Sequence, residues 1–191
     1  ITLYLDKSYS FIALPLIAGS VLNLNAFAHG GSPEEFSLSL IVFSLYYLLK
    51  YFKEVYPKDI SDRWIFINGI VAGCILWIKF TFLGFWIGWM VSILLGLLIQ
   101  KEFKKIVKSS VVFLLGMAAA TVPWVLYFGL NNAIYEWIQS YFVINLTAYS
   151  QPMSLFSRMK FVFYTLYGFR DSPIIVGLMG LGLMVFLTLK K

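Results

Sequence analysis

The chain has 191 residues and a formal net charge of +6; 60% of its residues are hydrophobic and only 13% are charged. An ordinary soluble domain is about 45–50% apolar and about 25% charged, and one of this size could not bury so much apolar surface. The composition therefore excludes a soluble globular fold, and the single cysteine excludes a disulfide-rich one. The apolar stretches run unbroken rather than alternating, which favours an all-α, polytopic transmembrane helical bundle over an outer-membrane barrel.

Six apolar segments are long enough, or nearly so, to cross the hydrocarbon core of a bilayer. They cover residues 8–28, 36–52, 64–79, 82–100, 107–129 and 172–189. The third and fourth are separated only by Lys79, Phe80 and Thr81, which predicts a tight hairpin. We expect residues 1–191 to form a single transmembrane domain. Because an apolar run begins close to Ile1, we also expect this domain to be an internal piece of a longer chain.

The basic residues alternate between the predicted loops. Of the 15 Lys and Arg residues, 11 fall in loops on one side and four on the other, and these four are Lys79, Arg158, Lys160 and Arg170. The positive-inside rule therefore predicts that both ends of this chain are cytoplasmic. The outer side then holds residues 28–35, 79–81 and 130–171. This asymmetry accounts for the net positive charge without a nucleic-acid partner.

Several kinds of chemistry are unsupported by the sequence. The chain has one histidine and one cysteine, too few for a Cys/His metal cluster, and it has no phosphate-binding glycine loop for ATP or a dinucleotide. No acidic or basic residue lies at the middle of a predicted span. A proton-coupled transporter would need titratable groups at that depth, so this reading is disfavoured.

The segment H-G-G-S-P-E-E-F, residues 29–36, begins the second predicted span on the outer side. Ser32 and Glu35 have the spacing of a capping box, and Pro33 holds the favoured first helical position. The two carboxylates of Glu34 and Glu35 also complement the helix dipole. The same carboxylates could accept a proton from a hydroxyl, bind sugar hydroxyls or hold a divalent metal, which is the one cofactor this pattern admits.

Lys79 lies in the predicted outer hairpin, close to Trp77, Phe80 and Phe82. Such a lysine is typical of a side chain that extends to the membrane interface between aromatic residues. The alternative is that its ammonium group binds the phosphate of a lipid at the outer surface.

The outer segment 130–171 contains two amphipathic stretches. Residues 131–142 carry Ile134, Trp137, Ile138 and Tyr141 at helical spacing, which predicts a helix lying on the membrane. A polar, turn-rich stretch follows at 145–152. Residues 153–168 then combine Arg158 and Lys160 with aromatic side chains, a pattern that fits either interfacial anchoring or the binding of phosphate and sugar. Arg170 and Asp171 are expected to form a local ion pair.

Two pairs of glycines have the spacing that lets membrane helices approach closely. Gly69 and Gly73 lie on the first helix of the predicted hairpin, and Gly84 and Gly88 lie on the second. We expect both pairs to serve packing within one subunit rather than dimerisation.

The order of these elements resembles the GT-C glycosyltransferases, in particular the bacterial branch similar to protein O-mannosyltransferases and lipid A aminoarabinose transferases. The resemblance depends on G-G-S-P-E-E-F followed by S-L-S-L-I-V-F-S-L-Y-Y-L-L-K-Y-F-K, on the hairpin G-I-V-A-G-C-I-L-W-I-K-F-T-F-L-G-F-W-I-G, and on V-P-W-V-L-Y-F-G before an outer amphipathic stretch. It covers most of residues 1–172, and the order of the motifs carries it.

The resemblance implies an active site at the outer face, a polyprenyl-phosphate-linked sugar as donor, and a general base in a first outer loop that would precede Ile1. By position, Glu34 and Glu35 match the acids of the family's second outer loop, and Lys79 matches the basic residue of its hairpin. Arg158, Lys160 and Arg170 lie in the expected substrate region without matching a motif, and His29 adjoins the acidic loop.

The sequence therefore predicts a membrane glycosyltransferase of the bacterial cytoplasmic membrane. It would transfer a sugar from a polyprenyl-phosphate donor to an acceptor hydroxyl on a glycan, lipid or protein at the outer face. Two alternatives stay open. A transporter or lipid-carrier flippase would need internal repeats or polar groups at the midplane, and the sequence offers neither clearly. A non-catalytic membrane assembly subunit would tolerate substitution of Glu34, Glu35 and Lys79.

Overall fold

The computed structural model describes residues 3, 30–58, 60–148 and 154–168. Within these residues the chain is helical and has no strand. The elements are α2 (Pro33–Lys50), a π-helical turn (Tyr51–Val55), α3 (Asp62–Lys79), a 3-10 turn (Phe80–Phe82), α4 (Leu83–Ile99), α5 (Phe103–Leu130), α6 (Ile134–Ile138), a second π-helical turn (Gln139–Val143), α7 (Ile144–Ala148) and α8 (Leu155–Gly168). The predicted spans 8–28 and 172–189 lie outside the described residues.

Three helical runs of the described chain are long and apolar enough to cross a membrane: Pro33–Val55, Asp62–Ile99 and Phe103–Leu130. They correspond to the four predicted spans between residues 36 and 129. The second run includes both α3 and α4, joined by the 3-10 turn Phe80–Phe82. The all-helical architecture and its membrane character agree with the prediction, and the described residues contain three such runs.

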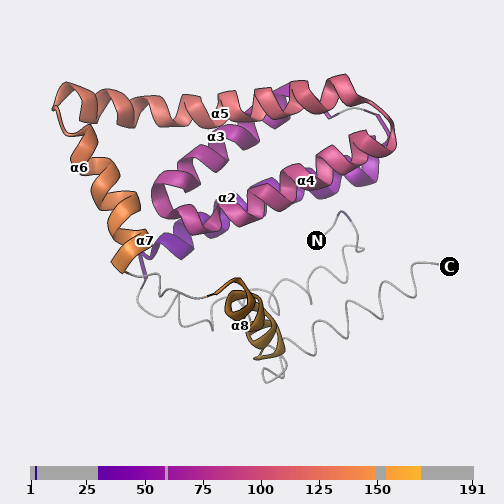
Figure 1. Cartoon of the computed structure of the whole chain (residues 1–191). Coiled ribbons are helices and arrows are strands. Elements are labelled where there is room, and N and C mark those ends of the chain that lie inside the picture. Colours follow the sequence, from indigo (N-terminus) through magenta and orange to yellow (C-terminus); the bar gives the residue numbers. More distant parts are fainter. Residues whose placement is uncertain (1–2, 4–29, 59, 149–153, 169–191) are drawn as a thin grey trace.

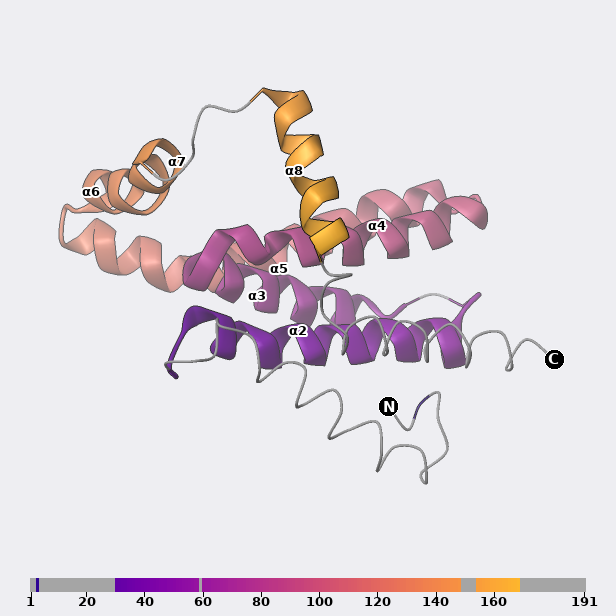
Figure 2. The same cartoon turned by 90° about the horizontal axis from the view of Figure 1, so that it is seen from below.

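The second run folds back on itself at Lys79. This residue has extended backbone angles, φ −160° and ψ 97°, which end the helical path of α3 before the 3-10 turn begins. α4 then returns along α3, as the predicted hairpin requires (Figure 1). α2 and α4 run in one direction, and α3 and α5 run in the other. The two views together show these four helices lying lengthwise beside one another (Figures 1 and 2).

The closest packing in this bundle joins α3 to α5 through glycines. A Cβ atom built on Gly69 would lie 3.0 Å from the Cα of Gly116, and one built on Gly73 would lie 2.6 Å from the Cβ of Ala120. Larger side chains at these positions would push the two helices apart, so the small residues are what permits the contact. The prediction that Gly69 and Gly73 serve packing within the chain is confirmed.

The second glycine pair behaves differently. A Cβ atom on Gly84 or Gly88 would meet no other atom within 4 Å, so among the described residues neither glycine supports a close contact. α4 packs through its opposite side, where Trp86, Trp89 and Ile93 are almost completely buried. The described residues therefore place no helix against Gly84 and Gly88, and close packing through this pair stays a prediction.

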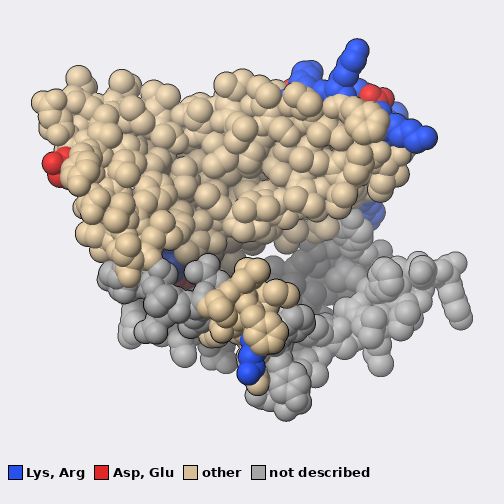
Figure 3. All heavy atoms as spheres, in the orientation of Figure 1, with Lys and Arg blue, Asp and Glu red and all other residues tan. Residues whose placement is uncertain are grey.

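The two ends of the bundle differ in charge. The junctions α2–α3 and α4–α5 meet at one end, and they carry most of the described basic residues: Lys50, Lys53, Lys58, Arg63, Lys101, Lys104, Lys105 and Lys108. We call this the basic end, and its Lys and Arg side chains gather on the right of the molecule in Figure 3. The opposite end, here the Lys79 end, holds the beginning of α2, the α3–α4 turn and α6.

Candidate functional site

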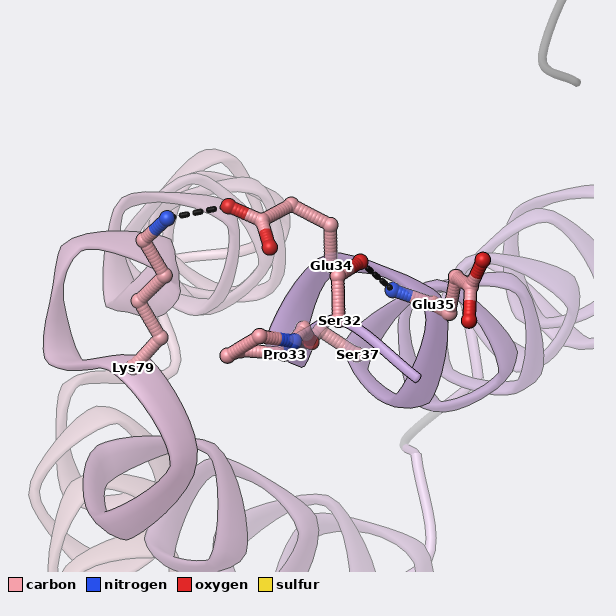
Figure 4. Close-up of polar contacts among 6 residues, drawn as sticks. All are labelled: Ser32, Pro33, Glu34, Glu35, Ser37 and Lys79. Atoms are coloured by element: carbon pink, nitrogen blue, oxygen red, sulfur yellow. Dashed lines mark hydrogen bonds and ion pairs between the residues drawn. The ribbon is translucent and has the colours of Figure 1, made fainter. Parts of the chain in front are cut away.

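An ion pair connects two residues that the sequence singled out separately. Glu34 lies in the first turn of α2 and Lys79 is the last residue of α3, and the Lys79 ammonium group bonds to the Glu34 carboxylate (Figure 4). Both side chains are partly exposed, with 24% and 40% of their surfaces accessible, so the pair lies at the surface of the Lys79 end. It fastens the beginning of α2 to the end of α3.

Glu35 has a different role from Glu34, because it takes part in the N-terminal cap of α2. The Ser32 hydroxyl oxygen accepts a hydrogen bond from the Glu35 amide at 3.3 Å, as the predicted cap requires. The Glu35 carboxylate accepts one from the amide of Gly31 at 2.5 Å, one residue earlier than in a standard capping box. Gly30 and Gly31 both have φ +66°, a conformation that glycine adopts without steric cost and that turns the chain into this cap.

The two acidic side chains consequently point in different directions. The Glu34 carboxylate faces Lys79, whereas the Glu35 carboxylate lies on the far side of Ser32 (Figure 4). They do not converge on one shared ligand position. Across the described residues, no three His, Cys, Asp or Glu side chains come together as a metal site would require.

Lys79 has an aromatic neighbour as well as its carboxylate. Its ammonium nitrogen lies 5.3 Å from the ring centre of Phe82, within the range of a cation–π interaction. The position between aromatic residues agrees with the interfacial lysine that the sequence predicted. The salt bridge to Glu34 was not foreseen, and it means that any anion binding to Lys79 must compete with a carboxylate.

A layer of aromatic side chains covers the end of α3 beside this pair. The Trp77 ring lies 4.5 Å from that of Trp137, and Trp137 in turn stacks on Phe128 at 4.7 Å. Phe80 contacts Tyr141 and its neighbour Phe142. These residues come from α3 with the 3-10 turn after it, from α5, and from α6 with the π-helical turn after it. The layer therefore holds three separate segments together at the Lys79 end.

Two polar contacts fix this aromatic layer. The Trp77 indole donates to the Thr121 hydroxyl at 3.0 Å, and the Tyr141 hydroxyl donates to the carbonyl of Leu76 at 2.5 Å. Burial raises the pKa of Tyr141 above its usual range. In the sequence, Tyr141 stands out only as part of an apolar stripe, although a tyrosine on such a stripe needs a partner for its hydroxyl when it is buried.

The segment after α5 also differs from its prediction. We expected residues 131–142 to lie on the membrane, but Trp137 and Tyr141 pack against the protein, because α3 offers the Trp77 ring and the Leu76 carbonyl there. The polar stretch expected at 145–152 is helical as far as Ala148. There the Asn145 amide and the Thr147 hydroxyl donate to carbonyls one turn earlier, at 2.7 Å each, so their polarity is satisfied inside the helix.

The other predicted substrate contacts are not brought to this pair by the described structure. His29 and Arg170 lie outside the described residues. Arg158 is on α8, but its side chain is outside the described part. Lys160 is on the same helix, and its ammonium nitrogen lies 5.6 Å from the ring centre of Tyr164. The predicted amphipathic stretch 153–168 does form a helix, Leu155–Gly168.

Comparisons with protein-family models, with curated proteins and with solved structures found no match for this chain. What the geometry offers is a carboxylate and an ammonium group held together at the surface of an apolar bundle, beside a packed aromatic layer. Such a pair can orient a hydroxyl through the carboxylate and bind an anionic group through the ammonium.

Proposed function

We propose that this chain is part of a membrane glycosyltransferase, which transfers a sugar from a polyprenyl-phosphate donor to an acceptor hydroxyl. The proposal is supported by one observation above the others: Glu34 and Lys79, which lie far apart in the sequence, share one position at the end of the bundle. A transferase of this kind needs a cation for the departing phosphate and a carboxylate for the acceptor, and both groups are present there.

In the proposed reaction the acceptor hydroxyl attacks the anomeric carbon, and the bond from that carbon to the phosphate oxygen breaks. Lys79 binds the departing polyprenyl phosphate and offsets its negative charge. Glu34 orients the acceptor hydroxyl and accepts its proton as the new bond forms. Glu35 keeps the loop before α2 in place through its bond to the Gly31 amide and does not touch the substrate.

The charge distribution supports one orientation of the bundle in the membrane. The basic end would face the cytoplasm of a bacterial cell and the Lys79 end would face outward, following the positive-inside rule. The donor head group would then meet Lys79 at the outer interface, while the prenyl tail would lie along exposed apolar helix surfaces. The acceptor would be a glycan, lipid or protein of the cell envelope.

A binding titration with three variants tests this assignment. The full-length protein in nanodiscs would be titrated with undecaprenyl phosphate, as wild type and as Lys79→Gln, Glu34→Gln and Glu35→Gln. We expect Lys79→Gln to weaken binding. Glu34→Gln should strengthen it, because the lysine loses its competing carboxylate, and should nevertheless lower sugar transfer. Glu35→Gln should leave the affinity unchanged.

Lys53→Gln serves as the matched control, because it removes one positive charge from the basic end. Equal weakening by Lys53→Gln and Lys79→Gln would show non-specific attraction and would contradict the assignment of Lys79. Weaker binding in Glu34→Gln would identify the ion pair as purely structural. Absence of binding by folded wild-type protein would remove the lipid donor and favour a non-catalytic assembly subunit or a transporter.

A further inference from the structure

A second site lies at the basic end of the bundle, far from Glu34 and Lys79. A half-open cavity of about 390 Å³ lies between the beginning of α3 and the beginning of α5. Its lining combines charged, hydroxyl and apolar side chains: Ile60, Ser61, Asp62, Leu97, Lys105, Lys108 and Ser109. The proposed transferase reaction uses none of these residues.

Ser109 is the most informative member of this lining. Only 5% of its surface is accessible, and the side chain borders the cavity. A hydroxyl at the wall of a cavity can donate a hydrogen bond to a polar group inside it, and can accept one from it. Its hydroxyl is therefore available to a polar ligand inside the cavity.

Ser61 contributes a second hydroxyl and the start of a helix. It is the N-cap residue of α3, yet its side chain makes no capping hydrogen bond. The first backbone N–H groups of an 18-residue helix, α3, therefore lie beside the cavity without a side-chain acceptor. Helix N-termini carry partial positive charge and attract anions.

The charges around the cavity also favour an anion. Lys108 forms an ion pair with Asp62, and Lys105 lies 3.2 Å from a Glu102 carboxylate oxygen. The cavity lining itself has two lysines and one acid, and the basic end adds further cations around it. Among the described lining residues, Asp62 is the one acidic group that would repel an anion, and it also forms the ion pair with Lys108.

We propose that this cavity binds the phosphate head group of an anionic phospholipid. The lysines and the two serine hydroxyls would hold the phosphate, and basic pockets between apolar helices are known to hold such head groups. The choice of a lipid over a free phosphate depends on the surroundings. Ile60 and Leu97 line the cavity, and Val107 and Val111 on α5 are largely exposed, so the acyl chains would have an apolar surface to follow.

Lipid binding to the full-length protein in detergent, measured by native mass spectrometry, tests this site. The probes are dioleoyl phosphatidylglycerol, dioleoyl phosphatidylcholine and inorganic phosphate. We expect the wild type to bind phosphatidylglycerol more tightly than phosphatidylcholine, and Lys108→Gln to weaken this binding about fivefold. Ser109→Ala should weaken it less. Asp62→Asn should strengthen it, because it removes the competing carboxylate.

Lys104→Gln is the matched control, since it makes the same charge change one turn away on α5, outside the cavity lining. Equal losses in Lys104→Gln and Lys108→Gln would overturn the site in favour of general electrostatic attraction. Weaker binding in Asp62→Asn would also overturn it. Displacement of the lipid by millimolar inorganic phosphate would show a free-phosphate site instead.

Lys108→Gln leaves Asp62 without its partner and could destabilise the fold, so folding is measured separately from lipid binding. The double variant Asp62→Asn/Lys108→Gln removes both charges, and its unfolding temperature without lipid should match that of the wild type. Loss of lipid preference in this folded double variant supports the site, and an unchanged preference contradicts it. None of these residues touches the Lys79 end, so this proposal can fail while the proposed transferase function stands.

Discussion

The two helices of the hairpin carry the same glycine spacing but use it differently. On α3, Gly69 and Gly73 let the backbone of α5 approach closely, and Gly116 completes the contact from the other side. On α4, Gly84 and Gly88 meet open space among the described residues, although their spacing is identical. The two glycine pairs differ in the helix surface that faces them. α5 presents Gly116 and Ala120 opposite α3, whereas the described chain presents no small-residue surface to the glycines of α4.

The comparison shows that a pair of glycines permits close packing without determining it. Two helices pack closely only where both carry small residues that face each other at the same level along the helix axes. α3 meets this condition and is also held by an ion pair and an aromatic layer, so it should be the most sensitive helix of the bundle. Four experiments test that conclusion.

The largest effect is expected from Gly116→Val. The new side chain would collide with the backbone at Phe66 and Gly69, so α3 and α5 would have to separate. We expect a loss of about 3 kcal/mol in the free energy of unfolding, the upper part of the range for overpacking. Unfolding of the full-length protein in detergent with increasing denaturant would measure it.

The matched control for this substitution is Gly88→Val, which adds the same side chain to the open face of α4. We expect the control to leave the stability close to that of the wild type. A loss as large as that of Gly116→Val would show that another segment or another copy packs on the glycines of α4.

Tyr141→Phe should have the next largest effect. It keeps the ring contacts with Trp77 and Phe80 but removes the hydrogen bond to the Leu76 carbonyl. We expect a loss of about 1 kcal/mol, and faster hydrogen exchange near the end of α3. Tyr135→Phe is the control, because Tyr135 is 73% exposed. Equal effects of the two substitutions would contradict the special position of Tyr141.

Gly88→Ala should act in the opposite direction. Alanine favours a helix over glycine by roughly 0.5–1 kcal/mol, and the open face of α4 has room for a methyl group. We therefore expect a small gain in stability, measured in the same denaturant series. Gly69→Ala provides the contrast and should be destabilising, because its methyl group would press against the backbone of α5.

The smallest effect is expected at the Glu34–Lys79 pair, because partly exposed ion pairs contribute little to stability. The variants Glu34→Gln and Lys79→Gln and the double variant form a cycle that isolates the coupling between the two side chains. We expect a coupling smaller than the loss caused by Tyr141→Phe, and one that decreases at high salt. A larger coupling would make this pair a main support of α3 rather than a candidate binding site.

The sequence was sufficient to predict the helices and the hairpin of the described bundle. Apolar runs bounded by charged residues locate α2 to α5 within a few residues, and the interruption at Lys79 locates the turn. It was also sufficient for the cap, because Ser32 and Glu35 act within one turn of a helix. These features depend on residues that are close together along the chain.

The pairing of surfaces could not be predicted in the same way. Glu34 and Lys79 meet only because α2 and α3 lie side by side, and the spacing of each residue within its own helix carries no information about the other. The same applies to Gly69 and Gly116. For Tyr141, the apolar stripe indicated a helix, but a membrane and a protein surface favour the same pattern of residues.

The contact between Gly69 and Gly116 also has a consequence for how the protein is made. A ribosome synthesises α3 first and must complete α4 before any part of α5 exists. During that interval the glycine face of α3 lacks the helix against which it finally packs, and α4 has no equivalent surface to offer. The glycine face of α3 therefore stays unpacked until α5 has been synthesised. A factor that covers this face during that interval would favour correct assembly.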